Sequence, residues 1–338
     1  MLDATWPPAL SWGVAGYGWV ARDFAVPGIR AAGGRLAAIA DPDPAARGQA
    51  AGQGVRAHAG LDALLADPEV AAIYVATPNH LHRPVVEAAA AAGLPVLCEK
   101  PMAASLADAE AMAVTVARAG IRYGTAFDQR HHPAHALMCD LIAEGRIGTV
   151  TAIRIAYACW VGPGFAADNW RADPARAGGG ALMDLAPHGL DLVDHLLGEP
   201  VTEIAALVQN RVQPYAVDDG AMLVGRTGSG VLVQLHVAYN CPEALPRRRL
   251  EVLGTRGQLT AARTMGQSPG GTLELIDGRL GLSRRLVVPD AEASPFARQM
   301  AAFARWIATG EGRDFDLARD LHTMRLLDRA YRSAASCP

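Results

Sequence analysis

Paired cysteines, long apolar runs and an excess of charge of one sign are all missing from this 338-residue sequence. Its five cysteines are scattered and form no C-x-x-C pair, which argues against a zinc site or a redox dithiol and is typical of reduced, structural cysteines. No apolar run reaches the roughly 18 residues that span a bilayer, and residues 1–10 lack the features of a secretory signal. We therefore expect a cytoplasmic protein with no membrane partner.

The charge balance gives no indication of a polyanionic partner. The 31 Lys and Arg residues are offset by 34 Asp and Glu residues, and the formal net charge is −3. A protein that wraps nucleic acid needs a basic field, so nucleic acid is not expected as a partner. The hydrophobic content of 51% over this length is enough for two domains with substantial cores.

The first third of the chain alternates short β-rich runs with Ala-rich helical stretches, which is typical of a parallel sheet covered by helices. A helix is expected to start at Ser105, where Asp108 allows reciprocal capping of backbone N–H groups, and to stop at Gly120. Residues 1–128 are thus predicted to form a doubly wound α/β domain. Its expected strands are 10–15, 35–40, 71–77, 94–98 and 121–127.

After Phe127 the pattern changes. A helix at 134–144 precedes β-rich runs that alternate with turns, and this favours a mostly antiparallel sheet. The tail returns to helical spacing at 295–308 and 316–333. Residues 129–338 are predicted to form a second, α+β domain. Its expected strands are 150–156, 202–208, 221–224, 231–238 and 249–253.

A glycine-rich segment, Gly16-Tyr17-Gly18-Trp19-Val20-Ala21, follows the first predicted strand and opens a helical stretch. Gly16 permits a tight turn, Gly18 lets the backbone approach a pyrophosphate, and the small Ala21 lets the helix pack on the strand. The pattern predicts a dinucleotide site, although a glycine turn without a nucleotide stays open as an alternative. The cofactor contacts expected here are Gly16, Tyr17, Gly18, Trp19 and Val20.

The type of dinucleotide is indicated by Asp41, which stands at the end of the second strand and 25 residues after Gly16. A carboxylate at this place accepts hydrogen bonds from both adenosine ribose hydroxyls and repels a 2′-phosphate. NAD is therefore expected rather than NADP, with Arg47 as the feature that leaves NADP open.

Polar residues follow two further strands, in the segments Thr77-Pro78-Asn79-His80 and Glu99-Lys100-Pro101. In a doubly wound sheet these strand ends face the ligand crevice. Lys100 is the group best suited to polarise a substrate oxygen, whereas the alternative is that Glu99 and Lys100 are solvated loop charges. The cofactor contacts expected from these segments are Thr77, Pro78, Asn79, His82, Glu99 and Lys100.

A third set of candidates follows the glycine run at 178–180. If the segment is helical, Asp184 and His188 stand four residues apart and share a face. A histidine can take a hydroxyl proton near neutral pH, and an adjacent carboxylate would orient its ring. The alternatives are a surface ion pair and a metal site that also uses Asp191 and His195. Four such groups on one helix do not converge on one ion, so no metal is predicted.

Other candidates carry less information. Trp170 and Arg171 are expected to wall the substrate pocket. The histidines at 131, 132 and 135 lie in a polar segment and are expected at the surface or along a crevice. Looser candidates, each individually more typical of a core or an interface, are Tyr157, Trp160, Asp168, His236 and Tyr239.

Taken in order, these segments resemble the Gfo/Idh/MocA oxidoreductases. The resemblance implies a Rossmann domain followed by an open-faced, largely antiparallel sheet that makes dimer or tetramer contacts. It also implies a catalytic lysine at Lys100, with Asp184 and His188 completing the catalytic group and also contacting a small polyhydroxylated substrate. The motifs that carry it are residues 13–21, 40–42, 77–79, 99–101, 170–171, 178–188 and 330–334.

The expected activity is transfer of a hydride between NAD and a secondary hydroxyl group of a sugar, a sugar derivative or a cyclitol. The family also contains NAD-dependent glycoside hydrolases that oxidise their substrate only transiently, and a non-catalytic NAD-binding homologue is a further alternative. The sequence departs from the family at Ala186-Pro187, where a glycine and an aliphatic residue are usual. We expect the helix either to begin near Pro187 or to kink there.

Overall fold

The structure, a computed structural model, describes residues 9–166 and 169–336. The chain forms two compact units. The first contains the chain up to Ala126 and a returning segment, Phe296–Leu321, while the second contains Phe127–Pro295 and the chain from His322. The sequence placed all of residues 129–338 in the second domain, so the returning segment is a difference from the prediction.

The first unit is built on a parallel sheet in the order β3-β2-β1-β4-β5-β6. This is the doubly wound order, in which the chain changes direction between β1 and β4 and ligands bind outside the carboxyl ends of the strands. β3 was not predicted because it is only three residues long and lacks a buried apolar run. The strands are β1 (Ser11–Ala15), β2 (Arg35–Ala40), β3 (Arg56–His58), β4 (Ala72–Val75), β5 (Val96–Glu99) and β6 (Tyr123–Ala126).

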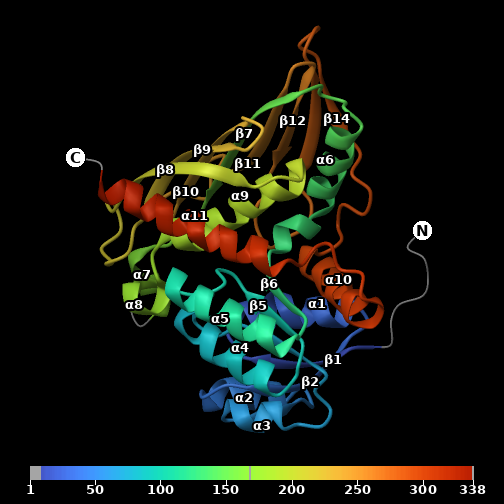
Figure 1. Cartoon of the computed structure of the whole chain (residues 1–338), viewed down its shortest axis with the longest axis vertical. Helices are drawn as coiled ribbons and strands as arrows, with labels where there is room; N and C mark the ends of the chain where they lie inside the picture. The colour runs from blue at the N-terminus through green and yellow to red at the C-terminus, as the bar shows by residue number, and fades with distance from the viewer. Residues whose placement is uncertain (1–8, 167–168, 337–338) are drawn as a thin grey trace. The chain divides into compact units, whose positions relative to one another are not determined.

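Helices cover this sheet, with α4 and α5 packed side by side (Figure 1). α5 begins at the predicted cap, because the Ser105 hydroxyl oxygen accepts the Asp108 N–H at 3.1 Å, and it ends at Gly120 in the left-handed conformation. The Ser105 hydroxyl also donates to the Asp108 carboxylate at 2.8 Å. The helical segments are η1 (Ala21–Ala25), α1 (Val26–Ala31), α2 (Pro44–Ala51), α3 (Leu61–Leu65), η2 (Asn79–Leu81), α4 (His82–Ala91), α5 (Leu106–Ala119), α10 (Pro295–Thr309) and the start of α11 (Leu317–Ala335).

The returning segment belongs to the first unit because its apolar face completes that unit's core. Phe303 of α10 is fully buried, and its ring centroid lies 5.6 Å from that of Trp12 in β1. Phe296 and Phe315 join the same buried cluster. Burying aromatic side chains of this size gives roughly 2–3 kcal/mol each, which explains why the chain returns.

The second unit is built on a sheet in the order β14-β13-β12-β11-β7-β10-β9-β8. All neighbouring strands are antiparallel except β7 and β10, so the predicted sheet type is confirmed. The last three strands were not predicted, and β13 and β14 are largely half-buried or exposed. The strands are β7 (Val150–Ala158), β8 (Val201–Gln209), β9 (Gly220–Thr227), β10 (Leu232–Ala238), β11 (Arg248–Gly254), β12 (Gly257–Ala262), β13 (Thr272–Asp277) and β14 (Ser283–Leu286).

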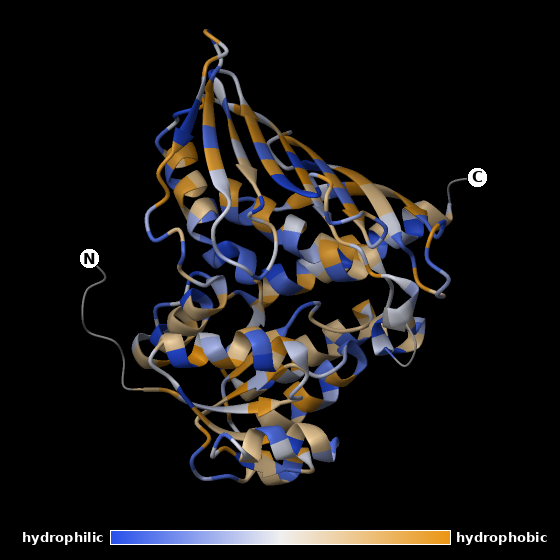
Figure 2. Ribbon diagram, turned by 180° about the vertical axis from the view of Figure 1, so that it is seen from behind, coloured by the Kyte–Doolittle hydropathy of each residue, from blue (hydrophilic) through white to orange (hydrophobic). Residues whose placement is uncertain are grey.

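The two faces of this sheet differ. On one face the cross-strand row of Leu223, Leu235, Ile155 and Leu250 is buried, and α9 packs against β7 and β10. The other face is open and carries exposed apolar side chains, and hydropathy alternates along the strands (Figure 2). The remaining helical segments of this unit are η3 (Asp128–His131), α6 (Pro133–Ala143), α7 (Pro163–Ala166), η4 (Trp170–Ala172), α8 (Pro174–Ala177) and α9 (Ala181–Leu197).

α9 runs without interruption from Ala181 to Leu197, so Pro187 lies inside the helix and the prediction that the helix begins near Pro187 is wrong. The helix start is fixed from outside. The Asp218 carboxylate accepts the N–H groups of Gly180 and Leu182, both at 2.8 Å, and thereby satisfies two backbone donors of the first turn. A side chain on Gly180 would clash with the Asp218 backbone, which explains the glycine. Asp184 and His188 therefore stand on one helix, and the alternative expectation of a kink at Pro187 stays a prediction.

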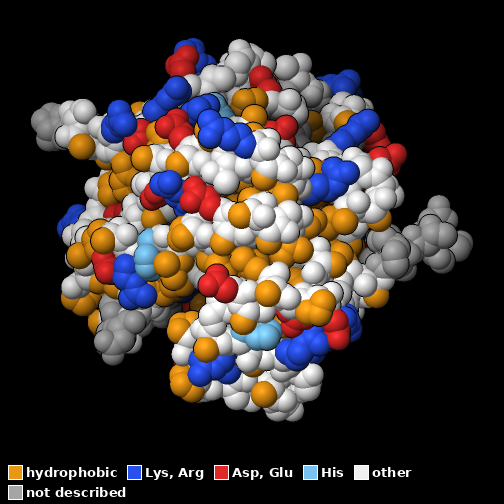
Figure 3. All heavy atoms as spheres, turned by 60° about the horizontal axis from the view of Figure 1, so that its bottom comes forward, with side chains coloured by type: hydrophobic (Ala, Val, Ile, Leu, Met, Phe, Trp, Pro, Cys, Tyr) orange, Lys and Arg blue, Asp and Glu red, His pale blue; other side chains and the backbone are white. Residues whose placement is uncertain are grey.

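The surface agrees with the composition. On the face drawn in Figure 3, the described Lys and Arg side chains are interspersed with Asp and Glu side chains. Within residues 9–166 and 169–336, no helix combines the length and apolar character needed to cross a bilayer.

Candidate functional site

The glycine-rich segment after β1 has the local geometry that a dinucleotide needs. Gly16 has φ of 86°, and a Cβ atom there would lie 2.7 Å from the Ala76 carbonyl oxygen, so only glycine fits. A Cβ atom on Gly18 would meet nothing within 4 Å, which leaves open space beside the backbone. The Arg22 N–H donates to the Gly18 carbonyl at 3.0 Å, so a helix starts directly at this turn. A helix N-terminus with open space before it fits a pyrophosphate.

Asp41 is held in place at the end of β2. One carboxylate oxygen accepts the Tyr17 N–H at 2.7 Å and the other accepts the Asp43 N–H at 2.8 Å. A carboxylate has about four acceptor positions, so Asp41 can still accept from ribose hydroxyls. The Arg47 guanidinium donates to the carbonyl oxygens of Asp41 and Pro42 at 2.9 and 2.8 Å. These hydrogen bonds support the turn after β2.

Two predicted cofactor contacts differ in how their side chains lie. The Tyr17 side chain is buried in the core, so Tyr17 offers its backbone. Trp19 is 39% exposed and its ring packs edge-on against Phe24 at 5.6 Å.

His82 connects the two loops that follow β4 and β5. Its Nδ1 lies 2.9 Å from the Pro101 carbonyl oxygen, and its Nε2 lies 3.0 Å from the Thr77 carbonyl oxygen. Burial lowers the pKa of His82 to about 4, against the effect of both carbonyls and with added repulsion from Lys100. Because His82 is fully buried, it supports the loop that carries Thr77, Pro78 and Asn79 rather than presenting its ring to a ligand.

Lys100 follows directly after β5. The neighbouring Glu99 carboxylate accepts hydrogen bonds from the Tyr74 hydroxyl and, at 3.3 Å, from the Lys100 N–H, and Lys100 itself is half-buried. Lys100 is the only lysine in the sequence, since 30 of the 31 basic residues are arginine. Lysine carries a compact, concentrated positive charge, whereas the charge of arginine is spread over a planar guanidinium. All the other Lys and Arg positions of the sequence hold arginine. The single lysine at position 100 therefore favours a chemical role for Lys100 over that of a solvated surface charge.

His188 lies in a buried cluster of the second unit. It is 3% exposed, its Nδ1 lies 3.4 Å from a carboxylate oxygen of Asp128, and its ring meets the Tyr157 ring edge-on at 5.5 Å. Gln129 fixes Asp128 by donating to its other oxygen at 2.9 Å and is itself hydrogen-bonded to the Gly266 backbone. A carboxylate on this side of the ring favours the tautomer that carries its proton on Nδ1.

Asp128 is thus a site residue that the sequence analysis missed. A usable signal was present, because Asp128 directly follows the predicted strand 121–127, at the same end of the sheet as the Thr77 and Lys100 segments. We expected Asp184 to orient the His188 ring, whereas the carboxylate that lies at His188 Nδ1 is that of Asp128.

Asp184 lies in the same cluster. The Tyr239 hydroxyl donates to its carboxylate at 2.7 Å. Burial raises the pKa of Tyr239, Asp184 raises it further, and the nearby Arg171 opposes the shift. The Arg171 guanidinium stacks over the Trp170 ring at 4.3 Å. The structure therefore brings Asp184, His188, Trp170 and Arg171 to one region of the second unit.

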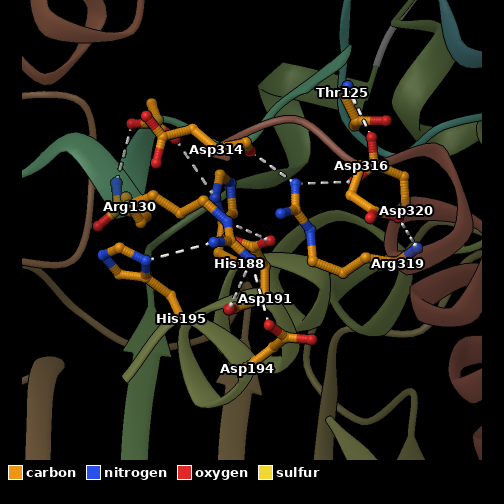
Figure 4. Close-up of polar contacts among 12 residues, drawn as sticks. Thr125, Arg130, His188, Asp191, Asp194, His195, Asp314, Asp316, Arg319 and Asp320 are labelled. Atoms are coloured by element: carbon orange, nitrogen blue, oxygen red, sulfur yellow. Dashed lines mark hydrogen bonds and ion pairs between the residues drawn. The ribbon is translucent and has the colours of Figure 1, made fainter. Parts of the chain in front are cut away.

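Asp191 and His195, considered above as metal ligands, contact Arg130 (Figure 4). Arg130 binds the Asp191 carboxylate at 2.7 Å and donates to His195 Nδ1 at 3.3 Å, with Asp194 at 3.8 Å. This buried ion pair anchors η3 to α9. Within the described ranges, no group of three or more His, Cys, Asp or Glu side chains could hold a metal ion.

The three neighbouring histidines are buried, so of the two expected positions the surface one is wrong, and a position along a crevice stays a prediction. His132 caps α6 by accepting the Ala134 N–H at 3.1 Å. His135 lies between the Gln129 carbonyl and the Thr264 hydroxyl, and burial lowers its pKa to about 4. Of the looser candidates, Tyr157 and Tyr239 join the His188 cluster. His236 lies on the opposite sheet face from Tyr157, Trp160 is 45% exposed, and Asp168 lies outside the described residues.

Comparisons with known proteins cover both units. A family model described as an oxidoreductase family with an NAD-binding Rossmann fold matches residues 10–127, and the GFO/IDH/MocA C-terminal domain matches residues 135–260. A 1,5-anhydro-D-fructose reductase from Ensifer adhaerens is 35% identical over 325 residues, which are 93% of this chain and 95% of the relative. A D-xylose 1-dehydrogenase (NADP(+)) from Haloferax volcanii is 31% identical over 78% of each chain. The crystal structure of an aldose-aldose oxidoreductase from Caulobacter crescentus in complex with glycerol superposes with a TM-score of 0.87 at 27% identity, covering 97% of this chain and 98% of that one.

Proposed function

Because this chain belongs to the Gfo/Idh/MocA family of NAD(P)-dependent oxidoreductases, we propose that it transfers a hydride between NAD and a secondary hydroxyl group of a sugar, a sugar derivative or a cyclitol. Relatives named as reductases and dehydrogenases of 1,5-anhydro-D-fructose, D-xylose and levoglucosan support a sugar-type substrate. The observation that carries the proposal is the pairing of His188 with Asp128 in a chain whose only lysine is Lys100.

The first unit supplies the cofactor contacts in this proposal. The turn at Gly16 and Gly18 would hold the pyrophosphate, and Asp41 would accept hydrogen bonds from the ribose. Asp41 favours NAD because a 2′-phosphate beside its carboxylate would be repelled, and Arg47 already donates to two carbonyls. When bound, NAD supplies the nicotinamide that takes up the hydride.

The proton is handled by the protein. His188 accepts the proton of the reacting hydroxyl at Nε2, while Asp128 orients the ring and stabilises the imidazolium. The Lys100 ammonium polarises the same oxygen as its bond to carbon gains double-bond character. Asp184, held by Tyr239, and the stacked Trp170 and Arg171 bind the other hydroxyl groups. In the reverse direction the same groups return the proton.

The test is absorbance at 340 nm with NAD and, separately, NADP across levoglucosan, D-xylose, myo-inositol and other polyols, and in reverse with NADH and 1,5-anhydro-D-fructose. Turnover with NAD and at least one of these compounds is the expected result. NAD binding without any turnover would favour the non-catalytic alternative. Release of p-nitrophenol from p-nitrophenyl glycosides without net NADH would favour the glycoside hydrolase.

We also expect a homodimer or homotetramer that pairs the open sheet face of one copy with that of another. Leu207, Val224 and Leu232 lie on this face and are 60–62% exposed. An apolar face of this kind is uncommon on a monomer. Sedimentation velocity at micromolar concentration should show at least a dimer that Val224→Glu dissociates, and a monomeric wild-type protein would contradict the expectation.

A further inference from the structure

A cavity of about 620 Å³ in the second unit is lined by three consecutive arginines, Arg247, Arg248 and Arg249, together with Arg263. It lies where β11 begins and β12 ends, and Glu243 and Thr272 complete its polar lining. The mechanism above uses none of these residues.

Arg248 occupies an unusual position for a charged side chain. It pairs with Tyr157 across the sheet, and alternation along β11 puts it on the same face as the fully buried Leu250 and Val252. A charge on an inward face costs free energy unless a partner compensates for it. The Arg248 guanidinium lies 5.8 Å from the Tyr157 ring centroid and packs against Gly266. Its Nε is buried without a hydrogen-bond partner in the described part of the chain.

The cavity carries an excess of positive charge. Arg247 pairs with Glu243 at 2.9 Å and Arg249 pairs with Glu251 at 2.7 Å. The guanidinium groups of Arg248 and Arg263 have no carboxylate within 4 Å among residues 9–166 and 169–336. Nη1 of Arg247 is also buried without a partner there. Two guanidinium groups that line a cavity without a paired carboxylate offer an uncompensated positive charge that an anion from outside can balance.

This cavity adjoins the His188 cluster. The Tyr157 ring, which lies beside Arg248, meets the His188 ring at 5.5 Å. Gly266, against which the Arg248 guanidinium packs, is hydrogen-bonded to Gln129, and Gln129 holds Asp128. A ligand in the cavity would therefore lie next to the groups that handle the reacting hydroxyl.

We propose that the cavity binds an anionic group of the substrate, a phosphate or a carboxylate, with Arg248 as its main contact and Arg263 as a second cation. Guanidinium groups suit this role because their N–H donors match two oxygens of either group. The substrate is then a sugar phosphate or a sugar acid rather than a neutral polyol. The inference rests on the proposed function, to which it adds the class of substrate.

Binding can be tested without turnover. Calorimetry with sodium phosphate should show saturable binding at constant ionic strength, with NAD present in excess so that the Gly16 turn is occupied. Arg248→Gln should weaken this binding by roughly 10- to 10²-fold, the value of a charge-assisted hydrogen bond. Arg226→Gln, which changes an exposed arginine paired with Glu203, is the matched control and should leave it unchanged. An unchanged Kd for phosphate in Arg248→Gln would overturn the proposal.

Stability distinguishes ligand binding from a structural role for Arg248. If the charge is kept on the inward face for a ligand, Arg248→Met should raise the Tm while phosphate binding is lost. If Arg248 instead supports the fold, the same variant should lower the Tm, and this result would count against the proposal.

Kinetics identify the anion and separate the two proposals. The kcat/KM values of D-glucose 6-phosphate and D-gluconate are compared with that of D-glucose, with NAD as the cofactor. The same comparison is made for other sugars and their phosphates and acids. The acidic member should have a kcat/KM at least about tenfold higher than the neutral sugar, through a lower KM. Arg248→Gln should remove this difference between the two substrates, whereas Arg226→Gln should keep it. If phosphate binding depends on Arg248 but no sugar is turned over, the proposed function is refuted and the proposal that the cavity binds an anion is kept. If neutral and acidic sugars have equal kcat/KM values, the proposal that the cavity binds an anionic group of the substrate is refuted and the proposed function is kept.

Discussion

The nucleotide-binding edge of the first unit and the His188 cluster of the second are assembled in different ways. At the edge, the turn at Gly16 and the start of the following helix are contiguous in sequence, and Asp41 is joined to them by a backbone hydrogen bond. The cluster draws His188 from α9, Asp128 from η3 and Tyr157 from β7. Local backbone geometry therefore specifies the first region, whereas the second exists only after distant segments have packed together.

The largest expected effect concerns Lys100. Lys100→Ala should lower kcat by roughly 10²- to 10⁴-fold, because the developing charge on the substrate oxygen loses its cation. The Kd for NAD should change little, because in this account Gly16, Gly18 and Asp41 supply the main cofactor contacts. Steady-state kinetics and NAD titration measure the two quantities.

Lys100→Arg is the matched control because it keeps the positive charge. Its kcat should stay far below the wild-type value, since a planar guanidinium does not replace a compact ammonium. Because Lys100 is the only lysine, an amine reagent modifies only Lys100 and the N-terminal amine. Loss of activity should therefore follow a single side-chain modification, with protection by substrate. A kcat for Lys100→Ala near the wild-type value would exclude Lys100 from catalysis.

Each unit also contains a buried histidine whose pKa is lowered to about 4, His82 in the first and His135 in the second. The unfolded chain takes up a proton near pH 6.5 and the folded chain does not, so stability is complete above pH 6.5 and declines as the pH falls toward 4. The loss should be about 3 kcal/mol for each histidine. Urea unfolding between pH 7 and 4 should show this decline, and it should be shallower in His135→Gln. An identical pH dependence in the variant would contradict this assignment.

An intermediate effect is expected for Asp128. Asp128→Asn should lower kcat by roughly 10- to 10²-fold, as for other carboxylates that orient a functional histidine. Removing the negative charge disfavours the imidazolium, so the acidic limb of the pH profile of kcat/KM should move to lower pH. Tyr157 and Arg248 also face this region and stay unchanged in the variant.

Asp194→Asn is the control for Asp128, because Asp194 stands on the same helix as His188 but lies beside Arg130. Asp194→Asn should leave the pH profile of kcat/KM unchanged. An unshifted profile in Asp128→Asn would mean that Asp128 holds the structure without acting through His188.

These two regions also mark how far the sequence alone could be interpreted. The parallel sheet, the mostly antiparallel sheet and the helices at 105–120 and 316–333 follow from periodicity and caps, which are local. The return of α10 to the first core depends on Phe303 meeting Trp12, nearly 300 positions earlier, and no local pattern contains that contact. The low helix preference of proline predicts a helix start or a kink at Pro187, whereas the start of α9 is fixed by hydrogen bonds to Asp218, which no local pattern contains.

The smallest expected effect is on cofactor choice. Asp41→Ala should weaken NAD binding by about tenfold, through the loss of its ribose hydrogen bonds, and should weaken NADP binding less. The affinity difference between the two cofactors, measured by calorimetry, should therefore narrow. Wild-type protein that binds NADP as tightly as NAD would show that Asp41 does not select the cofactor.

The proposed function depends most on Lys100 and His188 acting in the same step on one substrate. A double-mutant cycle of kcat with Lys100→Ala, His188→Ala and the combined variant tests it most directly. If the groups act together, either single loss already removes most of the catalytic effect, and the combined loss falls well short of the product of the two. Losses that multiply would show that the two residues act independently and would contradict this account.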